Sequence, residues 1–585
     1  MRHAKRIIAG LLSTTMIVTA LTGCGQEPAA PETEPTQTET TNDAQESQGE
    51  TAAGEEETSA KTAGAGEVPA WQAQMDWEKI GWQPDPEGLE WREDTSPITL
   101  DYYANFSWFS LDWTDSTAKR VTEKTGVDLN FTKPVVDDGQ KLNMMIAGNQ
   151  LPDIMTVDRN DAALQTMIDA EMLWSFEDLI DQYAPKMRDI LPKEILSNYK
   201  AEDGKTYQFT TWVQGEAWQK AAREYNQIIG TNQSTISVRK DYYDEIGRPE
   251  IKNMDDFIEA LGQMKANHPD KMGFYPADNS MAASTFASSA NLSHYGRYAG
   301  IGSDYSIDGD TVSWVVREDT FKKPMEYLNQ MYLQDLLTKD PFIDTKDVAK
   351  AKIEQGDVIS YAWTISDGTK VPGDNLDTQY EILPPFEDYV EIRTGTGWLA
   401  TVVPKSCKNP ERAIRFLEYL SSVEGHSDVS WGVEGEEYKN VEEGPNWHMV
   451  DGKPVLLEEY LVEKNADWGG VASKNGLGEY WLTCNELLWN LVWWDNSNEE
   501  MNKYNEWFGS HVQFRPELDI KSPSPDSEEG IIQQKAYSLL QQYSVEMIFT
   551  DDFEGKYQEF IDKIDEAGME RVEAYWTEEY KDNIR

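Results

Sequence analysis

The chain has 585 residues, with 105 Asp and Glu against 52 Lys and Arg, and a formal net charge of −53. This charge argues against nucleic acid and anionic lipid headgroups as partners and, less firmly, against polyanionic ligands, because like charges repel. The length is too great for one hydrophobic core and predicts two or three domains.

Residues 1–23 are predicted to be a signal peptide. Arg2, Lys5 and Arg6 precede an apolar run, Ile7–Leu21, that is interrupted by Gly, Ser and Thr. A membrane-spanning helix needs about 20 consecutive apolar residues, so this shorter run is typical of a cleaved signal. The tetrapeptide Leu-Thr-Gly-Cys at 21–24 resembles the bacterial lipobox, which implies that Cys24 is diacylated and begins the mature chain. The alternative is a chance Cys beside an ordinary cleavage site.

Residues 24–70 are predicted to be this acylated Cys followed by a disordered acidic tether. The segment has no aromatic residue, and Lys61 is its one basic residue among many acidic ones. Such a composition cannot bury enough apolar surface to offset the entropy lost on ordering. Its length spans roughly 40 Å as a flexible chain.

The body begins at Trp71 and alternates predicted strands with predicted helices. Ser175-Phe176-Glu177-Asp178 has the spacing of a capping box and opens a helix. Alternation with short turns predicts an α/β lobe with a largely parallel sheet. In chain order the first elements are a strand at 98–103, a helix at 114–126, a strand at 127–131, a helix at 141–147, a strand at 151–155 and a helix at 175–183.

The second half of the body continues this pattern. Asp308-Gly309 lies between short alternating runs and predicts a hairpin at 306–312. Asn409 and Pro410 together are typical of a helix start. The other predicted elements are strands at 236–239 and 399–403 and helices at 255–266 and 320–333.

The chain contains 21 Trp and 27 Tyr. Large flat rings present apolar faces, which suit the apolar C–H faces of sugar rings. Most of these rings must nevertheless belong to the core, as Trp489 and Trp493 do on one predicted helix face. Cys407 and Cys484 could pair outside the cell, but their separation in sequence leaves pairing and non-pairing both open.

The order and spacing of these segments resemble the extracellular solute-binding proteins of bacterial carbohydrate ABC importers, in the lipoprotein subgroup of family 1. The resemblance covers most of residues 98–440 and weakens after about 450. The matching segments are Leu151–Ile154, Leu179–Pro185, Asp203–Tyr207, Ser237–Asp241, Gly247–Pro249, the hairpin at 306–312, Val403–Ser406, Asn409–Glu411 and Trp431–Gly435 with Tyr438.

The resemblance implies an α/β, two-lobed, periplasmic-binding-protein-like (Venus-flytrap) fold with discontinuous lobes and hinge strands. We assign residues 98–230 plus 340–385 to the first lobe and 235–335 plus 395–585 to the second. Many relatives carry a calcium-binding loop after the helix that ends near residue 266. The stretch Lys265–Met272 lacks alternating oxygen ligands, so we expect no metal there and no cofactor.

The function implied is that of a lipid-anchored substrate-binding subunit at the extracytoplasmic face of a bacterial cell membrane. It would capture a neutral oligosaccharide between its lobes and deliver it to the permease subunits of an importer. We expect a monomer that is anchored through Cys24 and does not bind nucleic acid.

Candidate ligand-binding residues follow predicted strands, because ligands of α/β folds bind at the carboxyl ends of strands. Aromatic side chains are the predicted stacking platforms, with packing in the core as the alternative for each. Polar side chains could hydrogen-bond sugar hydroxyls, with a structural ion pair as the alternative. The candidates are Trp108, Phe109, Trp212, Trp218, Trp363, Trp398 and Trp431 among the aromatic residues, and Asp153, Arg239 and Glu434 among the polar ones.

Other functions are less favoured by the sequence. The six His residues show no metal-binding spacing, and no nucleophile-elbow motif is present. Gly395-Thr396-Gly397-Trp398-Leu399-Ala400 fits a dinucleotide-binding pattern, but a strand rather than a helix follows it. The alternatives are a peptide-binding or sensory solute-binding protein and a secreted glycan-cleaving enzyme. We expect no catalytic residues.

Overall fold

The computed structural model describes residues 68–107, 109, 112–136, 139–201, 203–224, 234–276, 295–344, 346–364, 380–480, 482–483, 485–492 and 499–584. The chain divides into two compact units, Met1–Thr62 and Ala63–Arg585, and the described residues belong to the second. The signal peptide, Cys24 and nearly all of the tether lie outside the described residues and stay predictions. Among the helices that are described, none is long and apolar enough to cross a membrane.

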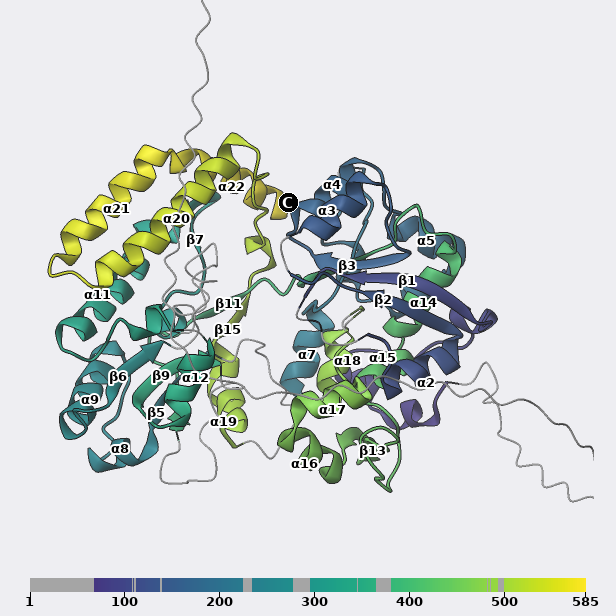
Figure 1. Ribbon diagram of the computed structural model, residues 1–585, viewed down its shortest axis with the longest axis horizontal. Helices are drawn as coiled ribbons and strands as arrows, with labels where there is room; N and C mark the ends of the chain where they lie inside the picture. Colours follow the sequence, from purple (N-terminus) through teal and green to yellow (C-terminus); the bar gives the residue numbers. More distant parts are fainter. Residues whose placement is uncertain are drawn as a thin grey trace, which may run out of the picture. The chain divides into compact units, whose positions relative to one another are not determined.

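The first lobe is built on a five-stranded sheet with the order β2-β1-β3-β12-β4 (Figure 1). β1 pairs in parallel with β2 and β3, whereas β12 runs antiparallel to β3 and β4. The strands are β1 (Ile98–Ala104), β2 (Val127–Thr132), β3 (Ile154–Asp158), β4 (Phe209–Thr210) and β12 (Leu399–Val402).

Helices cover both faces of this sheet, so its central strands are buried on two sides. Ile154 belongs to one apolar cluster, while Met155 and Val157 belong to another on the opposite face. Alternate side chains of a strand point to opposite faces, which accounts for the nearly continuous apolar run. The surrounding helices are α2 (Ser116–Thr125), α3 (Gln140–Ala147), α4 (Ala162–Asp169), α5 (Phe176–Tyr183), α6 (Met187–Ile190), α7 (Glu216–Glu224), α14 (Pro410–Ser421) and α15 (Val423–Ser430).

The predicted helices of this lobe begin and end where their capping residues lie. The Ser175 hydroxyl accepts the N–H of Asp178 at 3.1 Å, as the capping box predicts. Gly126 ends α2 in the left-handed conformation, with φ of 72°, and an added Cβ would lie 2.1 Å from the carbonyl oxygen of Thr95. Pro410 starts α14 as predicted, but the Asn409 side chain makes no capping hydrogen bond.

The second lobe is built on a four-stranded sheet with the order β10-β5-β9-β6. β9 pairs antiparallel with β5 and parallel with β6, while β10 runs antiparallel to β5. The strands are β5 (Ser234–Arg239), β6 (Met272–Pro276), β9 (Val358–Thr364) and β10 (Tyr380–Ile382), and the predicted hairpin is present as β7 (Tyr305–Asp308) and β8 (Thr311–Trp314).

One large apolar cluster joins this sheet to the C-terminal helices. Trp314 of β8 and Trp576 of α22 are both fully buried in it. Figure 1 shows α20, α21 and α22 lying side by side in this lobe, and contacts among all three agree. The helices are α8 (Lys240–Glu245), α9 (Met254–Asn267), α11 (Asp319–Leu333), α12 (Lys346–Glu354), α19 (Glu499–Phe508), α20 (Glu528–Ile548), α21 (Phe553–Ala567) and α22 (Met569–Asn583).

The strand pairing differs from the predicted lobe boundaries in two places. Residues 358–364 and 380–382 were expected in the first lobe, but β9 and β10 belong to the second-lobe sheet. Residues 399–492 were expected in the second lobe, but β12, α14 and α15 belong to the first, and so do the elements that follow α15 up to residue 492. An apolar run predicts a buried strand and carries no information about which of two sheets accepts it.

The chain therefore crosses between the lobes after α7, between β11 (Glu391–Arg393) and β12, and again after α18. β11 pairs in parallel with β15 (Val512–Phe514). The part of the first lobe that follows α15 contains β13 (Trp447–Val450), β14 (Lys453–Leu456), α16 (Glu458–Ala466), α17 (Trp468–Asn475) and α18 (Glu486–Val492).

Residues 70–93, for which no element was predicted, are also part of the first lobe and include the short helix α1 (Trp77–Ile80). The Trp71 ring packs against Trp431 and Trp447, with centroids 5.3 and 5.2 Å away. The Asp85 carboxylate accepts the N–H groups of Val423 and Glu424 at the start of α15. The backbone N–H of Trp91 donates to the Glu418 carboxyl of α14 at 2.6 Å.

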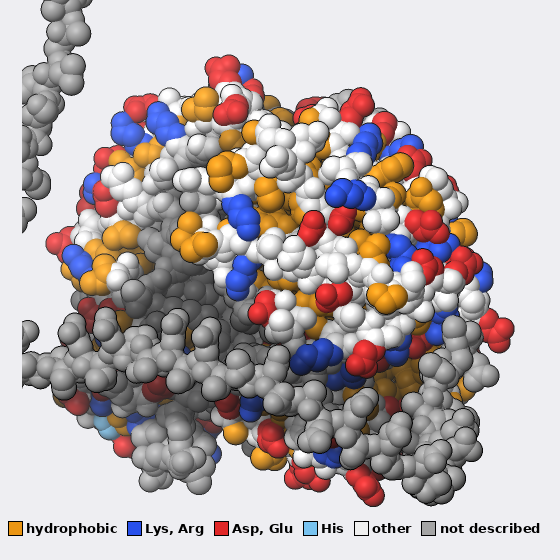
Figure 2. Space-filling model, turned by 45° about the vertical axis from the view of Figure 1, so that its right-hand side comes forward, with side chains coloured by type: hydrophobic (Ala, Val, Ile, Leu, Met, Phe, Trp, Pro, Cys, Tyr) orange, Lys and Arg blue, Asp and Glu red, His pale blue; other side chains and the backbone are white. Residues whose placement is uncertain are grey.

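Acidic and basic side chains are interspersed over the described residues of the face drawn in Figure 2. Many acidic and basic side chains of the described residues form ion pairs, such as that between the exposed Lys193 ammonium and the Glu216 carboxylate at 2.8 Å. Surface pairs of this kind contribute little to stability individually, about 0–1 kcal/mol.

The buried Glu418 makes a prediction for the pH dependence of stability. Burial, followed by a hydrogen bond with Glu90, raises the pKa of Glu418 from 4.5 to about 9. The folded protein therefore keeps a proton that the unfolded chain releases, so the contribution of Glu418 to stability is full below pH 4.5 and is lost as the pH rises toward 9. Glu418→Gln cannot ionise and should gain stability relative to wild type as the pH is raised from 5 to about 8.5.

Urea unfolding at several pH values measures this difference. Glu411→Gln, at an exposed position of the same helix, is the control and should follow the wild-type pH profile. A Glu418→Gln profile parallel to that of wild type would contradict the assignment.

Candidate functional site

Several loops of the first lobe meet at one edge of its sheet, which we call the carboxyl edge. β1 and β3 are parallel and end there, at Ala104 and Asp158. β12 starts at the same edge, because Leu399 pairs with Asp158. β4 ends there as well, since Thr210 pairs with Ala400. The residues at this edge are 105–107, 159–161, 211–214 and 394–398, and ligands of α/β folds bind at such an edge.

Three polar side chains lie at the carboxyl edge within a few residues of a strand end. The Asn105 amide donates to Asp161 Oδ2 at 3.2 Å and accepts from the Tyr103 hydroxyl at 2.8 Å. Asp158 Oδ2 accepts the indole N–H of Trp398 at 3.1 Å. All three are half-buried. Carboxylate and amide groups held in this way can hydrogen-bond the hydroxyls of a ligand.

Trp398 also lies at this edge. Among the predicted platforms that the structure describes, it is the most exposed residue. Its exposed fraction is 38%. The ring lies 6.3 Å from that of Phe106, and its N–H to Asp158 fixes its orientation. A ring with an open face and a fixed edge can stack on an apolar sugar face.

Gly397 places Trp398 close to the neighbouring strand. The Gly397 φ is +105°, and an added Cβ would lie 2.3 Å from Thr210 Cγ2 and 2.5 Å from the Thr211 carbonyl oxygen. The backbone N–H of Trp398 then donates to that Thr211 carbonyl at 3.0 Å. Only glycine permits this close approach at that backbone conformation.

Trp212 lies at the same edge, directly after β4. It is half-buried, adopts a φ of +61°, and packs edge-on against Trp489 with ring centroids 5.3 Å apart. A positive φ at a bulky residue is uncommon and is found most often at functional sites. The structure therefore brings Trp212 and Trp398 to one edge, and their binding role stays a prediction.

The other predicted aromatic platforms do not present an open ring. Phe109 is 7% exposed and stacks on Phe131, and Trp218, Trp363 and Trp431 are 3%, 1% and 0% exposed. The Trp431 indole donates to the Leu488 carbonyl at 2.9 Å inside a core cluster. These four predictions are corrected: the rings are core residues in this structure. Trp108 lies outside the described residues.

The predicted polar candidates have structural partners. Asp153 precedes β3, at the edge opposite the carboxyl edge, and accepts the N–H of Asp101 at 2.9 Å. The Arg239 guanidinium binds the Asp241 carboxylate and, at 3.0 Å, the Gly356 carbonyl oxygen. Glu434 is exposed and lies beside Trp447. Partial desolvation of its carboxyl, followed by repulsion from the Glu436 carboxylate, raises the pKa of Glu434. None of the three lies at the carboxyl edge.

Sequence reasoning missed Asn105, Asp158 and Asp161. Each lies at or within three residues of the end of β1 or β3, and closeness to a strand end is the signal that could have found them. In the second lobe, β6 and β9 end at Pro276 and Thr364, and residues 277–294 and 365–379 lie outside the described part. The candidate site is therefore described for the first lobe alone.

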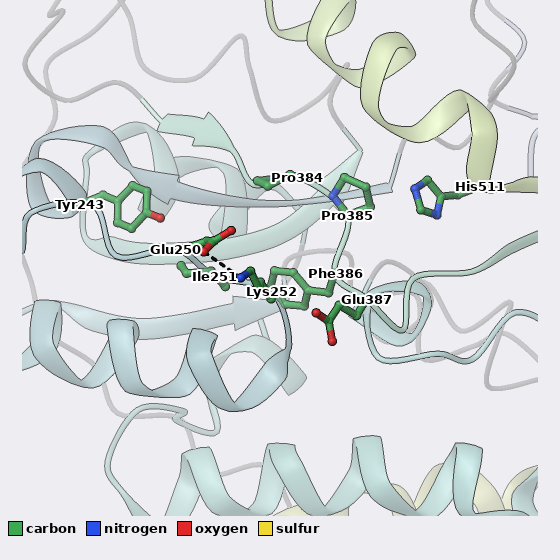
Figure 3. Close-up of a pocket in the computed structure, with 9 residues that line it drawn as sticks. All are labelled: Tyr243, Glu250, Ile251, Lys252, Pro384, Pro385, Phe386, Glu387 and His511. Carbon is green, nitrogen blue, oxygen red and sulfur yellow. Dashed lines mark ion pairs between the residues drawn. The ribbon is translucent and has the colours of Figure 1, made fainter.

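A separate cavity of about 410 Å³ lies in the second lobe (Figure 3). It is lined by Tyr243, Phe386, His511 and two prolines among others, with the Glu250–Lys252 ion pair, 2.9 Å long, on its wall. Tyr243 and Phe386 are only 8% and 1% exposed. The cavity offers no open aromatic face from these rings, so it fits a stacked sugar less well than the carboxyl edge does.

The loop compared above with a calcium site is closed by a side chain. The Lys265 ammonium donates to the carbonyl oxygens of Pro269 and Lys271, at 3.1 and 2.6 Å. Among the described residues, no group of three His, Cys, Asp or Glu could hold a metal ion. Cys407 is buried, and Cys484 lies outside the described residues, so the question of their pairing stays open.

A family model described as "Bacterial extracellular solute-binding protein" matches residues 116–430, which is more than half of the chain. The chain belongs to this family. Its members bind solutes, so the prediction of a binding protein rather than an enzyme is confirmed.

Two curated relatives are similar in sequence. The fructooligosaccharide ABC transporter substrate-binding protein FusA of Streptococcus pneumoniae is 24% identical over 54% of this chain and 60% of its own length. The polygalacturonan/rhamnogalacturonan-binding protein YtcQ of Bacillus subtilis is 21% identical over 59% of this chain and 68% of its own length. The match thus spans less than two thirds of the first of these relatives.

The FusA structure in complex with kestose is similar in fold, with a TM-score of 0.62 and 17% identity over 83% of this chain and 99% of that one. This similarity confirms the predicted two-lobed α/β solute-binding fold.

The close approach at Gly397 predicts a selective loss of stability. Gly397→Ala would force a Cβ against Thr210 and the Thr211 carbonyl and should lower the free energy of unfolding by about 2–3 kcal/mol. Gly204→Ala is the matched control, because Gly204 also has a positive φ, +79°, but no atom lies within 4 Å of an added Cβ. The control should lose only about 1 kcal/mol in urea unfolding. Equal losses in the two variants would contradict the packing described.

Proposed function

We propose that the protein is the substrate-binding subunit of an ABC importer and captures an oligosaccharide at the carboxyl edge of its first lobe. The observation that carries this proposal is Trp398, a residue that is 38% exposed and whose indole is oriented by Asp158. The site holds hydrogen-bonding groups beside an open apolar ring face, which is the chemistry a pyranose or furanose ring requires. The names of FusA and YtcQ support a glycan ligand.

We propose further that the ligand is neutral. The carboxylates at the edge, Asp158 and Asp161, lie in a chain with a net charge of −53. An acidic glycan would meet like charge from both the local carboxylates and the whole protein, which costs affinity. The two relatives differ on this point, since one is named for a fructooligosaccharide and the other for polygalacturonan.

The location and the delivery step belong to the same proposal. Arg2, Lys5, Arg6 and the lipobox-like residues 21–24 support export and acylation at Cys24. The acidic tether would then hold the body at the extracytoplasmic face, where the permease subunits of an importer receive the ligand. Ligand binding would favour one relative orientation of the lobes through its differential contacts.

Ligand binding by the wild-type protein and Trp398→Ala tests the site. Neutral oligosaccharides should raise the melting temperature of the wild type, and the ligand should be recovered intact. Trp398→Ala should raise Kd at least about tenfold, because it removes a desolvated aromatic contact. Calorimetric titration measures the change.

Trp82→Ala is the control, because Trp82 is half-buried and packs against the apolar cluster of Trp71, Trp431 and Trp447, which contains no residue of the carboxyl edge. It should keep the wild-type affinity. Tightest binding to uronates would contradict the neutral ligand, stabilisation by peptides alone would contradict the sugar, and new reducing ends would contradict a pure binding function.

Cys24→Ala tests the anchor. In a bacterial host that acylates lipoproteins, the wild-type protein should fractionate with membranes and incorporate labelled palmitate. The Cys24→Ala variant should lose the label and appear in the soluble extracytoplasmic fraction. Without Cys24 the mature N-terminus carries no acyl chains, so nothing anchors it stably in the bilayer. Cys407→Ala is the control and should stay with the membranes. Equal fractionation of the Cys24 and Cys407 variants would contradict lipidation at Cys24.

A further inference from the structure

Arg159 lies at the carboxyl edge of the first lobe, directly after β3, and its backbone and side chain hold the segment that crosses to the second lobe. We call residues 394–398 the crossing segment. The Arg159 backbone N–H donates to the Trp398 carbonyl at 3.1 Å. The Arg159 Nε–H donates to the Gly397 carbonyl at 2.7 Å. Two consecutive carbonyls of the crossing segment are therefore bound by one residue.

The same guanidinium also reaches the second lobe. Arg159 Nη2 lies 2.8 Å from Asp519 Oδ1, in an ion pair whose side chains are only 13% and 17% exposed. Asp519 is fixed to the second lobe, because its neighbours Leu518 and Ile520 belong to that lobe's core cluster. Its backbone carbonyl also accepts the Asn583 amide of α22 at 3.1 Å.

Tyr199 completes the contact from the first lobe. Its hydroxyl lies 2.6 Å from Asp519 Oδ2 and 3.1 Å from the Thr396 carbonyl oxygen. The Arg159 guanidinium carbon lies 5.0 Å from the centroid of the Tyr199 ring, within cation–π range. Both carboxylate oxygens of Asp519 are thus bound by first-lobe side chains that also bind the crossing segment.

We propose that Arg159 is a positioning residue that couples the Trp398 platform to the orientation of the second lobe. Its Nε–H binds the Gly397 carbonyl, next to Trp398, and its Nη2 binds the Asp519 carboxylate. A ligand that stacks on Trp398 and a rotation of the second lobe therefore act on the same side chain. The ligand half of this inference rests on the proposed function, while the link between the lobes does not.

The arrangement has the features that such a coupling needs. The ion pair is largely shielded from solvent, so its geometry is more sharply defined than that of a surface pair. Arginine presents its donors in a rigid planar fork, whereas the donors of a lysine ammonium rotate freely. Gly397 lies close against β4, so the crossing segment has little room to move. Any movement of this segment must therefore also move Arg159, which binds it.

Amide hydrogen exchange of the ligand-free protein tests the link between the lobes. Asp519→Asn removes the charge and keeps the shape of the side chain. Amides of residues 394–399 and 512–519 should exchange at least about tenfold faster in this variant, because local opening of the crossing segment becomes easier.

Arg317→Lys is the matched control. Arg317 binds Asp565 at 2.7 Å and Glu573 at 2.9 Å, all within the second lobe. The control should speed exchange near 312–317 and leave 394–399 unchanged. If Asp519→Asn does not fold, Tyr199→Phe removes one hydroxyl only and should speed exchange of 394–399 in the same direction. The proposal would be overturned if folded Asp519→Asn exchanged residues 394–399 at the wild-type rate. If Asp519→Asn does not fold, the same result in Tyr199→Phe would overturn it.

A binding measurement tests the ligand half separately. With a neutral oligosaccharide bound by the wild type, Asp519→Asn and Trp398→Ala should each raise Kd, and the double variant should raise it by less than the product of the two factors. Independent effects of the two substitutions would overturn the coupling to the ligand. If no oligosaccharide binds the wild type, the proposed function fails, and the exchange result still decides the link between the lobes.

Discussion

The pairing of β12 with β3 is the constraint on which the first-lobe site depends. It joins residues far apart in sequence, with Leu399 opposite Asp158 and Val402 opposite Met155. Because the pairing is antiparallel, β12 begins where β3 ends, and the crossing segment enters the sheet at the carboxyl edge. Trp398 therefore lies beside Asp158, and Arg159 beside Gly397. A shift of one residue would turn Trp398 toward the opposite face and separate these groups.

Burial separates the aromatic residues into two roles. Trp71, Trp431 and Trp447 pack together and join the N-terminal residues to the first lobe, whereas Trp398 keeps an open face. The high Trp content thus contributes to the core at many positions and to the candidate site at few. The strongly negative charge acts differently, since it affects which ligands approach rather than how the chain folds.

The sequence alone predicted the helix ends that are determined by neighbouring residues. Ser175, Gly126 and Pro410 mark helix ends through capping, a left-handed conformation and a fixed φ, and each lies where predicted. Lobe membership depends on long-range pairing, so β9 and β12 were assigned to the wrong sheets. The burial of Trp431 depends on residues 70–93, in which no element was predicted, so its local pattern could not separate a core ring from an open one. Resemblance to a family fixed the two-lobed fold better than any single motif did.

The central claim is that a glycan lies against Trp398 at the carboxyl edge and leaves unchanged. A crystal structure of the protein with a bound neutral oligosaccharide tests this claim most directly. We expect a sugar ring stacked on the Trp398 indole, with hydroxyls bound by Asn105, Asp158 or Asp161 and all glycosidic bonds intact. Density for the sugar in the second-lobe cavity beside Tyr243 and His511, with the Trp398 ring uncovered, would contradict it.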